Sequence, residues 1–201
     1  MLLQQQRLAH RTSQQLTSLS TALQLLKRSA TYSLIAVICA AYLVQLVVPS
    51  IEQHLVLPNL DYIKSSNEWY RLVTVALTHA GLLHLGFNMY SLMVLGNPLE
   101  AAFGPRKLLI VFFVSLLTGS LTSAYFASAY SYSVGASGAI FGLFGAFAIV
   151  GTKIGADIRS IVVIIGINFV IGFAMGGVDW RAHLGGLIGG VAAAQLVMAR
   201  K

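Results

Sequence analysis

Apolar residues in this 201-residue chain are gathered into long runs that shorter polar segments separate. A helix that crosses a bilayer needs about 20 mainly apolar residues. By that measure the sequence predicts six membrane spans, with one long connection after the first. The expected spans are residues 31–49, 79–97, 107–127, 134–151, 158–176 and 181–199. We therefore expect an all-α membrane protein built as a bundle of six transmembrane helices.

Two segments lie outside these spans. Residues 1–30 contain four basic residues, no acidic one, and leucines at helical spacing, so we expect an amphipathic helix on the inner membrane surface or a disordered tail. Residues 50–78 mix aromatic and apolar side chains with Glu52, Asp61 and Glu68. That mixture suits a partly membrane-embedded loop in the headgroup region or an ordinary packed loop. The domain itself is expected to cover residues 31–199.

The composition agrees with a membrane protein. Hydrophobic residues make up 57% of the chain and charged residues 9%, whereas about 25% of residues are charged in a soluble domain. The single cysteine, Cys39, excludes a disulfide framework within the chain. The net charge of +7 raises the question of nucleic-acid binding, but its distribution is better explained by membrane topology, and we expect no nucleic-acid partner.

Basic residues are concentrated on one side of the predicted bundle. With a cytosolic N-terminus, ten lie in inner segments and three in outer segments. This is the positive-inside bias of membrane proteins, and it predicts that both termini are cytosolic. The inner residues are Arg7, Arg11, Lys27, Arg28, Arg106, Lys107, Lys153, Arg159, Arg200 and Lys201; the outer ones are Lys64, Arg71 and Arg181.

This orientation brings polar side chains of three spans to one depth. Spans two, four and six all run from outside to inside, so their N-terminal ends share the outer leaflet. The polar residues at these ends are His79, His84 and Asn88 in span two, Ser137 in span four and His183 in span six. Helices rise about 1.5 Å per residue, so similar offsets from the span starts give similar depths. Polar side chains inside a membrane are costly and tend to be functional.

Small residues offer a way for spans four and six to approach closely. Gly138 and Gly142 are four residues apart in span four, and Gly186 and Gly190 have the same spacing in span six, as do Gly185 and Gly189. Such small-xxx-small spacing lets helix backbones meet. We expect this contact to bring the Ser137 hydroxyl within reach of the His183 imidazole.

A serine and a histidine form the minimum pair for nucleophilic catalysis. Taken singly, each of these residues has a structural explanation, because serines, asparagines and histidines often hydrogen-bond between membrane helices; we interpret His79 in that way. Asp157 and Asp179 fall at span ends, so we expect no acid beside the pair. A metal site made by His79, His84 and His183 is conceivable but leaves Ser137 unexplained. We expect neither a metal nor a cofactor.

Four motifs in order carry a family resemblance: Trp69-Tyr70-Arg71, the segment from His79 to Asn88, Gly135-Ala136-Ser137-Gly138 and Ala182-His183-Leu184-Gly185-Gly186. At these residues the chain resembles the rhomboid intramembrane serine proteases, over roughly residues 31–199. The resemblance implies a catalytic dyad without the usual acid. Tyr70 separates the tryptophan from the arginine, whereas the two are adjacent in many relatives.

The resemblance also implies a role for each residue that matches the family. Ser137 would be the nucleophile, His183 the general base and Phe141 the ring that stacks on the histidine. The oxyanion donors would be His84, Asn88 and the Ser137 N–H. Supporting roles would fall to Arg71 in the first loop and Glu100 at the corner between spans two and three, and helix packing to the glycines Gly135, Gly138, Gly142, Gly186 and Gly190.

The expected function is therefore endoproteolysis of the transmembrane segments of other membrane proteins, near their extracytoplasmic ends. One alternative is a catalytically silent rhomboid-like protein that binds membrane helices for quality control, although such proteins usually lack the serine or the histidine. A small transporter is a further alternative, but the intramembrane acids and inverted repeats typical of transporters are not seen. The minimal six-span chain leads us to expect a prokaryotic plasma membrane; its oligomeric state stays open.

Overall fold

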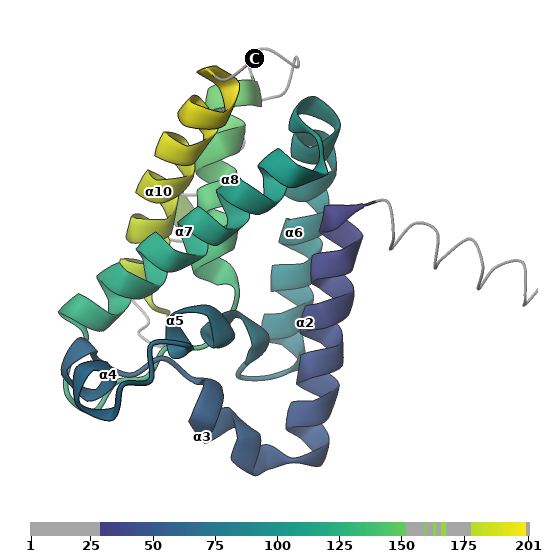
Figure 1. The fold of residues 1–201 in the computed structure, drawn as a ribbon. Coiled ribbons are helices and arrows are strands. Elements are labelled where there is room, and N and C mark those ends of the chain that lie inside the picture. The colour runs from purple at the N-terminus through teal and green to yellow at the C-terminus, as the bar shows by residue number, and fades with distance from the viewer. Residues whose placement is uncertain (1–28, 152–158, 160–162, 164–165, 168–177, 200–201) are drawn as a thin grey trace, which may run out of the picture.

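The computed structural model describes residues 29–151, 159, 163, 166–167 and 178–199. Apart from one isolated bridge, the regular secondary structure in these ranges is helical. The described residues contain five longer helices (Figure 1): α2 (Ala30–Val47), α6 (Leu82–Phe103), α7 (Pro105–Phe126), α8 (Ser137–Val150) and α10 (Trp180–Ala199). Five short elements lie between α2 and α6: η1 (Pro49–Ile51), α3 (Glu52–Leu55), α4 (Leu60–Ser66), α5 (Arg71–Thr74) and η2 (Val75–Leu77).

The expected all-α class is confirmed, and the expected number of spans is confirmed only in part. Among the described residues, α2, α7 and α10 are long and apolar enough to cross a membrane. A fourth span is reached if residues 71–77 and α6, which meet at 101°, count as one. Most of the predicted span 158–176, like residues 1–28, lies outside the described residues.

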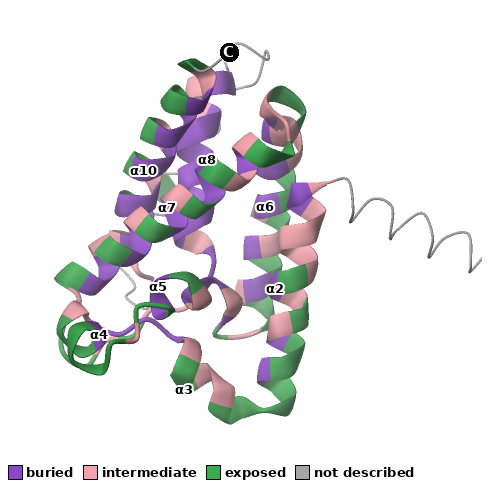
Figure 2. Ribbon diagram, in the orientation of Figure 1, coloured by how far each residue is buried: buried purple, intermediate pink, exposed green. Residues whose placement is uncertain are grey.

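Helix α8 is shorter than the predicted span 134–151. Its 14 residues rise about 21 Å, less than the roughly 30 Å hydrocarbon thickness. Figure 2 shows that most of α8 is buried, and α10 packs most extensively against α7 and α8. Because α8 is surrounded by protein, it does not need the full length of a lipid-facing helix. Its first residue, Ser137, therefore lies inside the bundle.

Glu100 near the end of α6 holds the start of α2. Its carboxylate accepts hydrogen bonds from the backbone N–H groups of Ala30 and Thr31 at 2.8 and 3.0 Å, and from the hydroxyls of Ser29 and Thr31 at 2.8 and 2.6 Å. A carboxylate at the positive end of a helix is a favourable electrostatic arrangement. We expected Glu100 to help fix the corner between α6 and α7. Its backbone carbonyl accepts a hydrogen bond from the Gly104 N–H at that corner at 2.8 Å, and its side chain joins α6 to α2.

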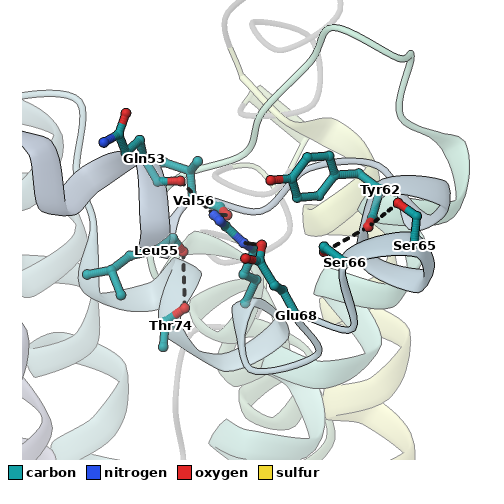
Figure 3. Close-up of polar contacts among 9 residues, drawn as sticks. Gln53, Leu55, Val56, Tyr62, Ser65, Ser66, Glu68 and Thr74 are labelled. Carbon is teal, nitrogen blue, oxygen red and sulfur yellow. Dashed lines mark hydrogen bonds and ion pairs between the residues drawn. The ribbon is translucent and has the colours of Figure 1, made fainter.

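The connection between α2 and α6 is a packed loop of short helices held together by Arg71. Figure 3 labels Gln53, Val56 and Glu68, the residues that bind its guanidinium. The buried guanidinium pairs with Glu68 at 2.6 Å and donates to the carbonyl oxygens of Gln53 and Val56 at 2.8 and 2.9 Å. This satisfies the charge within the loop. Exposed aromatic rings on the same loop, those of Tyr62, Trp69 and Tyr70, retain the character expected at a headgroup boundary.

Candidate active site

The turn that leads into α8 is set by Gly135. Its φ of +106° lies in the region that favours glycine, and its N–H donates to the carbonyl of Val75 at 3.0 Å. A methyl group at this position would also lie 2.8 Å from Cε1 of His84. Glycine is therefore required both by the backbone conformation and by the close approach of the His84 ring. The turn places Ser137 as the first residue of α8.

Ser137 and His183 lie within hydrogen-bond distance of each other. The Ser137 Oγ is 2.9 Å from the His183 Nε2, although the two residues are 46 positions apart in the sequence. His183 is buried in the first turn of α10, and Ser137 is half-buried. A serine hydroxyl at this distance from an imidazole nitrogen has the geometry that proton transfer between them requires.

Glycine contacts between α8 and α10 allow this approach. A methyl group added to Gly186 would collide with the carbonyl oxygen of Gly138, and one added to Gly190 would collide with that of Gly142. Backbone thus meets backbone along the α8–α10 contact, as the glycine spacing predicts. The glycines at 185 and 189 face α7 instead, where a methyl group would collide with Thr122 and Thr118 respectively.

The Gly186→Val variant is expected to lose stability. The added side chain has to enter a backbone–backbone contact that cannot yield locally, and overpacking typically costs about 1–3 kcal/mol and occasionally more. Thermal unfolding in detergent should show a lowered midpoint. The matched control is Gly86→Val, because Gly86 is also helical but has open space around its Cα. Equal midpoints for the two variants would contradict this account of the contact.

The His183 imidazole lies flat against the ring of Phe141. The ring centroids are 3.9 Å apart and the planes differ by 9°. Phe141 is one turn after Ser137 on α8 and is itself buried. Stacking restricts rotation of the imidazole, so the nitrogen facing Ser137 keeps its position.

We expect Phe141→Ala to lower the turnover number by about 10-fold, because a small displacement of a catalytic group can cost up to about 100-fold. Phe141→Tyr keeps the stacking face and should stay near the wild-type rate. Steady-state cleavage of a model substrate checks both variants. A Phe141→Ala enzyme as fast as Phe141→Tyr would show that the ring does not hold the histidine.

His84 and Asn88 line the same cavity as the Ser137–His183 pair, with a volume of ≈ 650 Å³. The N–H of Ala80 donates to His84 Nδ1 at 3.4 Å, which assigns the ring proton to Nε2. One N–H of the Asn88 amide donates to the carbonyl of His84 at 2.9 Å. The structure thus brings both predicted oxyanion residues into the cavity, where His84 has its Nε2–H to offer and Asn88 its second amide N–H.

His79 lies outside helix α6, and its ring packs against the ring of His84. It precedes α6, and its ring centroid is 5.1 Å from that of His84 and 6.4 Å from that of Tyr42. Its backbone is held by Gln45, whose side chain accepts from the His79 N–H at 3.1 Å and donates to the His79 carbonyl at 2.9 Å. These hydrogen bonds are made by the backbone of His79. Both of its ring nitrogens are buried without a hydrogen-bond partner among the described residues, so the interpretation of the ring as a hydrogen-bonding group between helices is wrong. The described residues contain no group of three potential metal-ligating side chains.

Asp179 was not predicted to be part of the site. We placed it at a span end and expected no acid beside the pair, but the structure shows it in the wall of the same cavity together with Ser123. The physical reason is that α10 begins at the wall of this cavity, so the residue that precedes it also lines the cavity. The signal in the sequence was an aspartate two residues before the predicted helix start at 181, because aspartate is a preferred N-cap residue.

Fold and cavity together define the class of protein: an all-helical membrane protein in which a serine and a histidine meet between apolar helices. Comparison with known proteins gives the family. Residues 66–200 match the model of the Rhomboid domain. The chain therefore belongs to the rhomboid family.

Several curated relatives support this assignment. Rhomboid protease GluP of Bacillus subtilis (strain 168) is 41% identical over 138 residues, which cover 65% of this chain and 26% of the relative. RHOMBOID-like protein 6, mitochondrial, of Arabidopsis thaliana is 40% identical over 141 residues, covering 65% and 45%. RHOMBOID-like protein 1 of Arabidopsis thaliana is 37% identical over 140 residues, covering 66% and 35%. The chain thus matches less than half the length of each of these relatives.

One of these relatives, GluP, is named a rhomboid protease, so the family includes proteases. The family and the apolar helices together indicate an integral membrane protein.

Proposed function

We propose that this protein is an intramembrane serine endopeptidase in which Ser137 is the nucleophile and His183 the general base. The observation that carries the proposal is the 2.9 Å separation of Ser137 Oγ and His183 Nε2. The imidazole is stacked on Phe141, so the pair is held in a defined geometry. These contacts occur within the Rhomboid domain match.

The reaction follows from these positions. His183 Nε2 removes the hydroxyl proton as Ser137 Oγ attacks the substrate carbonyl, and the tetrahedral intermediate collapses to an acyl-enzyme as the imidazolium returns its proton to the leaving amine. Water then attacks the ester, with His183 again accepting a proton. The cavity has polar side chains in its lining and room for that water.

The developing negative charge needs donors. We expect three groups to supply them: the N–H of Ser137 at the start of α8, the Nε2–H of His84 and the second amide N–H of Asn88. The start of a helix also carries a partial positive charge. Preorganised donors of this kind are worth about 2.7–4 kcal/mol each in the transition state.

The substrate class follows from the surroundings of the pair. A transmembrane helix hides its carbonyls in hydrogen bonds, so a substrate must unwind locally before attack. The positive-inside distribution of basic residues supports a site near the extracytoplasmic face. We therefore propose cleavage of other membrane proteins near the extracytoplasmic ends of their spans, and a prokaryotic plasma membrane as the location.

A catalytically silent relative that binds membrane helices is the competing function. Such a protein has no need of a serine hydroxyl aligned with a stacked imidazole. The geometry of the pair therefore favours the protease.

Mapping the cleavage site tests the proposal. Purified wild-type protein in liposomes should cut a single-span model substrate, and mass spectrometry of the two products should place the cut inside the apolar segment near its extracytoplasmic end. A cut in the water-exposed flank, or no cut in any of several single-span substrates, would overturn the proposal.

A further inference from the structure

Asp179 joins two helices at the point where the histidine-bearing helix begins. It directly precedes α10, and its Oδ1 accepts a hydrogen bond from the N–H of Ala182 at 3.2 Å. Its Oδ2 accepts a hydrogen bond from the hydroxyl of Ser123 on α7. One carboxylate thus caps the first turn of α10 and ties that turn to α7.

The tie lies next to the catalytic pair. The N–H of His183 donates to the carbonyl oxygen of Asp179 at 3.2 Å, so the histidine belongs to the same turn that the carboxylate caps. Asp179, Ser123, His183 and Ser137 all line one cavity. A change in the rotation or height of this turn would therefore move the imidazole relative to the serine hydroxyl.

The charge of Asp179 also reaches the imidazole. Asp179 and His183 are four residues apart at the start of α10, a spacing that brings side chains to one face of a helix, and both line the cavity. When Ser137 attacks, His183 becomes a cation. A fixed negative charge nearby stabilises that cation.

We propose, resting on the function proposed above, that Asp179 is a positioning residue for His183: it anchors the first turn of α10 to Ser123 of α7 and places a negative charge in the turn that carries the imidazole. The Ser137–His183 dyad is then supported by an acid, which acts by holding the first turn of α10.

Four variants separate this role from simple helix capping. Asp179→Ala removes the cap, the tie and the charge. Asp179→Asn keeps a good capping side chain and the size but loses the charge. Ser123→Ala removes only the tie. Asp61→Ala is the matched control, because Asp61 is an exposed acid in the first turn of another helix, α4.

The readouts are the turnover number and KM in liposomes and the thermal midpoint in detergent. We expect Asp179→Ala to lower the turnover number about 10- to 100-fold, as for a misplaced catalytic group, with KM nearly unchanged. Asp179→Asn should keep the midpoint yet turn over about 10-fold more slowly, a smaller loss than the about 10⁴-fold for a triad aspartate changed to asparagine. Ser123→Ala should lose less, and the loss should not add to that of Asp179→Ala.

Each other outcome counts against the proposal. A wild-type turnover number for Asp179→Asn, with a lowered midpoint for Asp179→Ala, would reduce Asp179 to a helix cap. If the losses for Ser123→Ala and Asp179→Ala add, the hydrogen bond between Ser123 and Asp179 does not act in positioning the histidine. If the variants change only KM, Asp179 acts in substrate binding. If wild-type protein neither cleaves nor reacts with a fluorophosphonate, the proposed function itself fails; if it does both and the Asp179 variants match Asp61→Ala, only the present inference fails.

Discussion

Replacing His183 with alanine is expected to slow both substrate cleavage and fluorophosphonate labelling of the protein by about 10²- to 10⁴-fold, the usual contribution of a general base. Without the imidazole 2.9 Å from its hydroxyl, Ser137 has no group to take its proton. Both reactions require the activated serine, so both rates should fall together. The measurement is a time course of each reaction with equal amounts of folded protein.

The control for this variant is His54→Ala. His54 is exposed on α3 and does not line the cavity that holds the catalytic pair. It should leave both rates at the wild-type value. A His183→Ala protein that labels as fast as His54→Ala would contradict the assignment of the base.

The Ser137→Ala variant is expected to lose cleavage by at least about 10⁴-fold, because removal of a nucleophile leaves only the binding and oxyanion contributions. Its folding should be almost unchanged, since one half-buried hydroxyl and its hydrogen bond contribute about 0.5–1.5 kcal/mol. Cleavage in liposomes and thermal unfolding in detergent check the two halves of this prediction. A Ser133→Ala variant, which changes another serine of the same cavity, should cleave normally.

Hydrophobic patterning predicted the long helices well where lipid determines their length. The first predicted span, 31–49, corresponds to α2 (Ala30–Val47), and the third, 107–127, to α7 (Pro105–Phe126). It failed at α8, which is shorter than 134–151 because protein surrounds it. An apolar run does not reveal whether lipid or protein will cover it.

The glycine spacing predicted a contact between two helices, whereas the polar side chains did not reveal which helices they would contact. The four-residue glycine spacing correctly predicted the contact of Gly138 with Gly186, because such repeats report directly on helix approach. The side-chain contacts of Asp179 and of Glu100 were not predicted. Each makes its contacts with residues of a distant helix, and no local pattern encodes which helix that is.

Locating the covalent adduct of a fluorophosphonate tests the central claim most directly. Wild-type protein in detergent is labelled, digested and analysed by tandem mass spectrometry. The account predicts that the adduct is carried by Ser137 alone, although Ser123, Ser131 and Ser133 line the same cavity. An adduct on one of those serines, with Ser137 unmodified, would contradict it.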